Sequence, residues 1–136
     1  MVDANVVIRE YLISKVSLTD LVDERIYAAN PLPENVTLPA IAFFVRGGTS
    51  IPEVPTIIIP SVQFNCWADD PIEARKIYRA LYDVLNGLGN EEIVIDAISY
   101  YIVLAREEVQ GQDIQDVDIQ GLWNVLTFYS ITIRNY

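Results

Sequence analysis

The sequence predicts a single α+β domain over residues 1–136, in which an antiparallel sheet of about four strands carries two main helices on one face. Two patterns favour this class. Apolar residues recur with helical spacing over residues 2–16 and 71–86, whereas the other apolar runs are rich in β-branched and aromatic residues, which favour strands. A length of 136 residues and a hydrophobic content of 51% suffice for one packed core.

The first helix is expected to bury one side of its surface. Asp3 or Asn5 is the expected N-cap, because its side-chain oxygen can accept a hydrogen bond from a free backbone N–H. A second, short helix is expected near Ser17 and Asp20, which resemble a capping box, and a brief extended segment, residues 25–28, follows it. The residues expected to form the apolar side of the first helix are Val7, Ile8, Tyr11 and Leu12.

The helix over residues 71–86 has the clearest sequence boundaries. Asp70 is placed to cap it, and Pro71 occupies the first position, where the missing N–H of proline costs nothing. Gly87 supplies the C-terminal stop. We therefore expect about four turns of helix with one apolar face.

Four runs are expected to form the strands: residues 39–46, 61–67, 93–105 and 122–134. The run 61–67 alternates between apolar and polar residues, which is typical of a strand with one buried face. The first run ends at Gly47 and Gly48, which can turn with positive φ. The last two runs are expected to pair as antiparallel strands.

Two segments carry more apolar residues than a solvated loop needs. Residues 49–60 form an arm with three prolines, too irregular for a central strand, and residues 107–121 form a loop with five acidic residues and no basic residue. Monomers rarely leave such patches exposed, so either these segments fold back as extra strands or neighbouring chains cover them. Both alternatives stay open. The candidate interface residues are Ile51, Val54, Ile57, Ile58, Val109, Ile114, Val117 and Ile119.

Residue usage argues against an enzyme. The chain has no histidine, which removes Ser-His-Asp and Cys-His catalysis and the usual imidazole metal ligands. Its one cysteine, Cys66, shares a predicted strand face with Val62 and Phe64, so we expect it to be buried and unreactive. We therefore expect no catalytic residue, no metal site and no cofactor.

Two acidic patterns resemble metal sites, but simpler explanations account for both. Asp69 and Asp70 precede a helix and are expected to cap it. Residues 116–121 resemble the opening of an EF-hand loop, yet position twelve is Thr127, where a bidentate glutamate is required. A solvated connection between two strands is the expected structure there.

The net charge of −10 argues against a protein that neutralises nucleic-acid phosphates, because such binding requires clustered lysine and arginine. No stretch reaches the ~20 apolar residues that a membrane-spanning helix needs. The first ten residues lack a basic region followed by an apolar run, as a signal peptide would have. We expect a protein made in a cytoplasm, without a membrane partner.

Short motifs in residues 5–86 resemble a known family. An N-terminal helix is followed by the run Leu21-Val-Asp-Glu-Arg-Ile-Tyr27, then by Leu38-Pro-Ala-Ile41, then by a strand that leads through Trp67-Ala-Asp69 into a helix containing Glu73-Ala74. This order resembles the tail terminator or tail completion proteins of long-tailed bacteriophages, which include the tail-to-head joining proteins. The C-terminal strand pair resembles the family layout in kind only.

The resemblance implies a structural virion protein of small α+β fold and not an enzyme. It implies a homo-hexameric ring at the head-proximal end of the tail, assembled in the host cytoplasm. The implied partners are the tail tube (major tail) protein below the ring and a head completion or connector protein above it. Genome DNA would pass through the channel without specific binding.

The acidic segment has two possible roles in such a ring. Its carboxylates could line the channel and repel passing DNA, or they could face a basic surface of the tail tube or connector protein. An alternative function, a soluble bacterial α+β module that binds a ligand or peptide, would be expected as a monomer with an apolar pocket. The acidic residues concerned are Glu107, Glu108, Asp113, Asp116 and Asp118.

Overall fold

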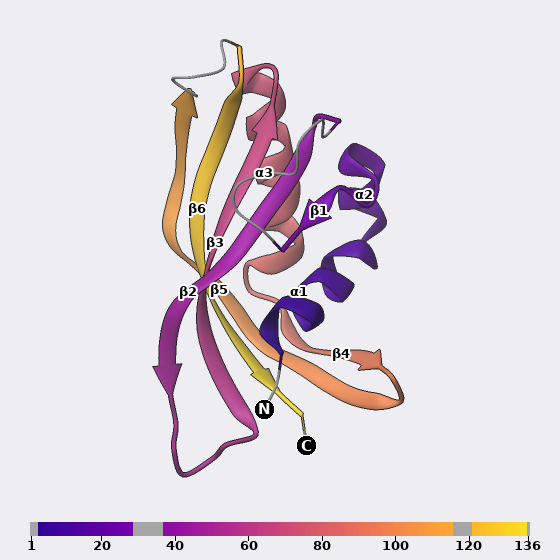
Figure 1. The fold of residues 1–136 in the computed structure, drawn as a ribbon, viewed down its shortest axis with the longest axis vertical. Coiled ribbons are helices and arrows are strands. Elements are labelled where there is room, and N and C mark those ends of the chain that lie inside the picture. Colours follow the sequence, from indigo (N-terminus) through magenta and orange to yellow (C-terminus); the bar gives the residue numbers. More distant parts are fainter. Residues whose placement is uncertain (1–2, 29–36, 116–120, 136) are drawn as a thin grey trace.

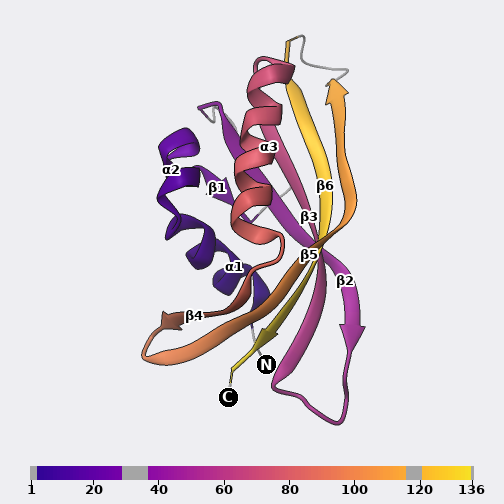
Figure 2. The same cartoon turned by 180° about the vertical axis from the view of Figure 1, so that it is seen from behind.

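The computed structural model describes residues 3–28, 37–115 and 121–135. This part of the chain forms one strongly curled, six-stranded sheet with three helices on the same side of it (Figures 1 and 2). The strand order is β1-β2-β3-β6-β5-β4; β1 runs parallel to β2, and every other neighbouring pair is antiparallel. The elements are α1 (Ala4–Ile13), α2 (Val16–Val22), β1 (Ile26–Tyr27), β2 (Ala40–Ser50), β3 (Ile57–Ala68), α3 (Pro71–Leu85), β4 (Gly89–Ile95), β5 (Ile98–Gln115) and β6 (Trp123–Arg134).

The α+β class is confirmed, but the expected number of about four strands is wrong. The predicted single strand over residues 93–105 contains a tight turn at Asp96 and Ala97, whose φ angles are 51° and 65°. Consecutive positive φ angles are typical of the two-residue turns that join hairpin strands. Alanine is not a residue that favours this geometry, so the sequence carried no clear turn signal, and β4 and β5 were merged in the prediction.

Of the two alternatives for the acidic segment, residues 107–121, folding back as a strand is confirmed for its described part, and the expected loop is wrong there. Its described part, up to Gln115, belongs to β5, and β6 pairs with β5 along this whole length. The backbone partners that β6 supplies outweigh the weak strand preference of the acidic residues. Three irregularities in register absorb the imperfect fit between the two strands.

The predicted irregular arm is a β-hairpin over much of its length. β2 continues to Ser50 and β3 begins at Ile57, so only residues 51–56 connect the two strands. A register shift between Val45 and Gly48 marks a bulge, and a Cβ on Gly48 would overlap the Ile59 carbonyl oxygen. The glycine therefore allows the close backbone approach that keeps a proline-containing strand in the sheet.

The helix predictions are confirmed in position and corrected in detail. Asp3 and Asp70 cap α1 and α3, with their side-chain oxygens 3.1 Å and 2.8 Å from the amides of Asn5 and Ile72. The capping box expected at Ser17 is wrong, because α2 begins at Val16 and its N-cap side chain makes no capping hydrogen bond.

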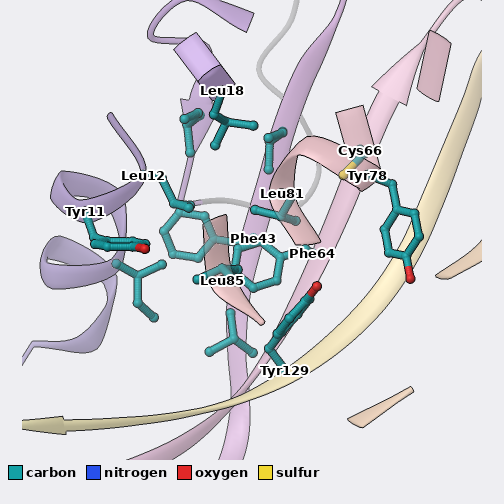
Figure 3. Packing of buried hydrophobic residues seen from close by; sticks show 14 of the residues in the cluster. Tyr11, Leu12, Leu18, Phe43, Phe64, Cys66, Tyr78, Leu81, Leu85 and Tyr129 are labelled. Carbon is teal, nitrogen blue, oxygen red and sulfur yellow. The ribbon is translucent and has the colours of Figure 1, made fainter. Parts of the chain in front are cut away.

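The core lies between the helices and one face of the sheet. Phe43, Phe64 and Tyr129 come from three adjacent strands, with neighbouring ring centroids 5.6 Å apart. Leu81 and Leu85 of α3 point toward this group (Figure 3). Cys66 is fully buried beside them, as expected, and burial raises the pKa of its thiol.

A buried tyrosine joins the two long helices. The Tyr11 hydroxyl of α1 donates a hydrogen bond to the Val84 carbonyl of α3. Burial, and to a smaller extent the negative charge of Glu91, raises the pKa of Tyr11 to about 12. Burial likewise raises the pKa of Tyr129.

Stability should therefore fall in alkaline solution. The pKa of tyrosine in an unfolded chain is about 10, so above that pH the unfolded chain loses a proton that folded Tyr11 keeps until about pH 12. The free energy of unfolding should fall by about 1.4 kcal/mol per pH unit for each such tyrosine. Urea unfolding measured from about pH 9 to about pH 11.5 checks this, and Tyr11→Phe should make the slope shallower. A flat profile would contradict the prediction.

Candidate assembly surface

The described residues contain no group of three or more histidine, cysteine, aspartate or glutamate side chains that could hold a metal ion. No helix in the described ranges is long and apolar enough to cross a lipid bilayer.

The hairpin arm supplies four of the candidate interface residues. Ile57 and Ile58 lie in β3 opposite Arg134 and Ile133 of β6, and Ile58 packs against the core. Ile51 is half-buried, and the Val54 amide donates to its carbonyl in the connecting turn. Val54 itself is 37% exposed. The arm thus buries much of its apolar surface within its own chain and leaves Val54 at the tip.

The other candidate residues lie on or beyond β5. Val109 is 47% exposed and Ile114 is half-buried, whereas Val117 and Ile119 lie outside the described residues. The β2–β3 turn and the far end of β5 are at opposite ends of the molecule (Figure 1). The two predicted segments therefore do not form one patch on a single subunit.

The described acidic residues of this segment all have partners within the chain. Glu107 accepts hydrogen bonds from the hydroxyls of Tyr78 (2.6 Å) and Thr127 (2.8 Å). The Ser61 hydroxyl donates to Glu108 (2.8 Å). Arg75 pairs with Asp113 at 2.8 Å. Asp116 lies outside the described residues. Asp118 also lies outside them.

Tyr78 fixes α3 onto β5. Its hydroxyl donates to Glu107 and accepts from the Gly111 amide at 3.1 Å. Burial, followed by the hydrogen bond to Glu107, raises the pKa of Tyr78. Arg75, one turn earlier in α3, donates to the Gly111 carbonyl at 3.0 Å. The helix therefore depends on polar contacts with a segment that the sequence suggested was a loop.

An open groove of about 390 Å³ lies beside this contact. Its lining combines two tyrosines with charged and amide side chains, so it lacks the apolar character of most small-molecule pockets. The lining residues are Tyr78, Arg79, Tyr82, Asp83, Glu107 and Gln110.

The sheet face opposite the helices, called here the helix-free face, carries a second polar network. The Arg46 guanidinium lies 3.9 Å from the centroid of the Phe128 ring and donates to the Ser61 hydroxyl at 3.1 Å. Asn65 donates to Asn124 at 3.1 Å, and these two side chains are only 8% and 4% exposed. The alternation of residues 61–67 predicted this polar face, but not its partners, which lie on other strands.

Both edges of the sheet are open in the described structure. β4 pairs only with β5, so its outer backbone groups have no strand partner there. At the other edge, β1 pairs only with Ile41 and Ala42 of β2. On the outer side of β2, no described strand flanks the remainder, from Phe43 to Ser50. Open edges are sites at which a further chain can add to a sheet.

The contact between α3 and β5 leads to a test of the corrected fold. A Cβ on Gly111 would lie 2.7 Å from both Tyr78 Cζ and Val125 Cγ1, whereas a Cβ on Gly89 would meet no atom within 4 Å. Gly111→Ala should lower the free energy of unfolding by about 1–3 kcal/mol through overpacking, and Gly89→Ala should change it by less than about 0.5 kcal/mol. Urea unfolding of both variants provides the measurement. Equal stability of the two would contradict the strand assignment of this segment.

Comparison with known proteins relates the fold to a chain of a solved assembly. No protein-family model matches the sequence, and comparison with curated proteins gives no match. Among solved structures, the fold is similar to that of a chain in the "Virion of native gene transfer agent (GTA) particle", with a TM-score of 0.62 over 97% of this chain and 95% of that chain. The two sequences are 12% identical, so the similarity shows a shared fold over almost the full length of both chains.

Proposed function

We propose that this chain is a structural protein of a phage-like particle and that it acts as a tail terminator. In this role it forms a hexameric ring that ends the tail tube and joins it to the head connector. The observation that carries the proposal is the shared fold with a virion chain over 97% of this chain. The motifs in residues 5–86 that resemble tail terminators support the more specific role.

The surfaces of the subunit are compatible with a ring. Head-to-tail contacts use two different patches on each subunit, and they close when the rotation between copies divides the circle. The β2–β3 turn and the far end of β5 are two separate patches at opposite ends of the molecule (Figure 1). Val54 and Val109 are the most exposed of the candidate interface residues that the structure describes.

The proposed ring has partners on both sides. The tail tube protein would bind one side and a head completion or connector protein the other, with genome DNA passing through the central channel. A chain with a net charge of −10 does not attract DNA phosphates, which is compatible with passage without specific binding.

The oligomeric state tests the proposal directly. The purified protein, measured by size-exclusion chromatography with light scattering, should show a mass six times 15.4 kDa at high concentration, and electron microscopy should show rings. Particles that lack the protein should have tails of uncontrolled length or unjoined heads. A strict monomer, together with normal tails in its absence, would contradict the proposed function.

Substitutions at the proposed contacts should weaken the ring. Val54→Asp or Val109→Asp would place a carboxylate in a contact that excludes water, so each should lower the association constant by about tenfold or more. Val16→Asp is the matched control, because Val16 is also exposed, at 68%, but lies on α2. Light scattering over a concentration series gives the comparison. Equal assembly of all three variants would exclude Val54 and Val109 from the contact.

A further inference from the structure

We propose that neighbouring subunits join by extending the sheet: β4 of one copy adds to the open edge of β2 in the next copy. This inference rests on the proposed ring and adds a contact between copies that is separate from those proposed at Val54 and Val109. The occupant of each open edge is therefore a second copy of this chain.

The two edges are suited to each other in length and in position. β4 spans Gly89–Ile95, and the part of β2 whose outer edge has no described strand beside it spans Phe43 to Ser50. Figures 1 and 2 both show β4 and the far end of β2 on opposite sides of the molecule, toward the same end. Copies arranged head to tail can thus bring these edges together.

The charges on the two strands are complementary. β4 carries Glu91 and Glu92, whereas Arg46 is the only charged residue of β2. Glu92 lies on the helix-free face, where it accepts a hydrogen bond from Tyr101 at 2.9 Å, and Arg46 lies on that same face over the Phe128 ring. When two sheets join edge to edge, each face of one continues in the other, so Arg46 of one copy and Glu92 of the next would lie on one face at the joint. Their charged groups would meet when the side chains turn from Phe128 and Tyr101 toward the partner strand.

Apolar residues lie next to both charged groups. Val94, two residues after Glu92 and on the same face, is 59% exposed. Phe44, two residues before Arg46 on β2 and on the same face, is half-buried. Four antiparallel pairings separate β2 from β4 in the sheet, so the two strands run in the same direction and would be parallel at the joint. With Glu92 beside Arg46, Phe44 and Val94 then lie on opposite sides of the charged pair, and the contact between opposite charges stabilises the neighbouring strands.

The same charges disfavour the symmetric alternative. Two copies that paired through β4 alone would bring four glutamates, Glu91 and Glu92 from each copy, into one contact. Like charges on directly opposed strands destabilise a sheet. Pairing of β4 with β2 avoids this repulsion and is the head-to-tail contact that a closed ring requires.

Charge exchange between Arg46 and Glu92 tests the joint. Arg46→Glu and Glu92→Arg should each lower the association constant of the full chain by about tenfold or more, because each puts like charges opposite one another. The double variant should recover assembly. An equimolar mixture of the two single variants should also recover it, because six subunits can alternate and every joint then holds one acidic and one basic residue.

Three controls make the result specific. Glu91 lies beside Glu92 but opposite Ile102, on the core face, so Glu91→Arg should not rescue Arg46→Glu. Arg106→Glu changes the same charge on β5, an interior strand, and should leave assembly unchanged. Arg46 also contacts Phe128 and Ser61, so circular dichroism must show that each variant is folded. If Arg46→Glu does not fold, the assembly of Glu92→Arg is compared with the assembly of Glu91→Arg.

The outcomes separate the joint from the ring. Recovery in the double variant and in the mixture, measured by light scattering, supports sheet extension. A hexamer that is insensitive to these changes, or that Glu91→Arg rescues equally well, overturns the joint but leaves the ring in place. A wild-type chain that never forms hexamers and whose absence leaves tails normal overturns the proposed function, and with it the joint.

Discussion

The pairing of β3 with β6 at the centre of the sheet is the constraint on which the rest of the structure depends. Its register aligns the strands from Ile57 opposite Arg134 to Ala68 opposite Trp123. Because side chains alternate along a strand, this register sends one set of residues into the core, where Phe64 meets Tyr129 edge to face. A slip of one residue would turn each strand's apolar set to the wrong face.

The opposite face follows from the same register. It brings Asn65 beside Asn124, and the two nearly buried amides share a hydrogen bond. An unpaired buried amide would cost about 1–3 kcal/mol, so the pair favours this register over its neighbours. The helix-free face is therefore an ordered polar and aromatic surface with a defined cross-strand arrangement.

The acidic composition has local uses that net charge alone does not reveal. Glu107 accepts hydrogen bonds from Tyr78 and Thr127 between α3 and the sheet, and Asp113 pairs with Arg75. The exposed pair contributes little stability by itself, but Glu107 satisfies hydroxyls at a partly buried contact. Some of the carboxylates that could serve a channel or a partner thus also hold the subunit together.

Local signals were enough to predict the class of fold, the capped helix α3, the buried Cys66 and the alternating strand over residues 61–67, because caps and periodicity can be recognised without knowing the tertiary contacts. The tertiary structure decided that residues 107–115 are a strand, since β6 supplies their backbone partners, and that Asp96 and Ala97 form a hairpin turn. Long-range packing also separates the apolar candidates: Ile58 is partly buried against the core of its own chain, whereas Val54 stays exposed. Such outcomes depend on strands distant in sequence, which no local pattern specifies.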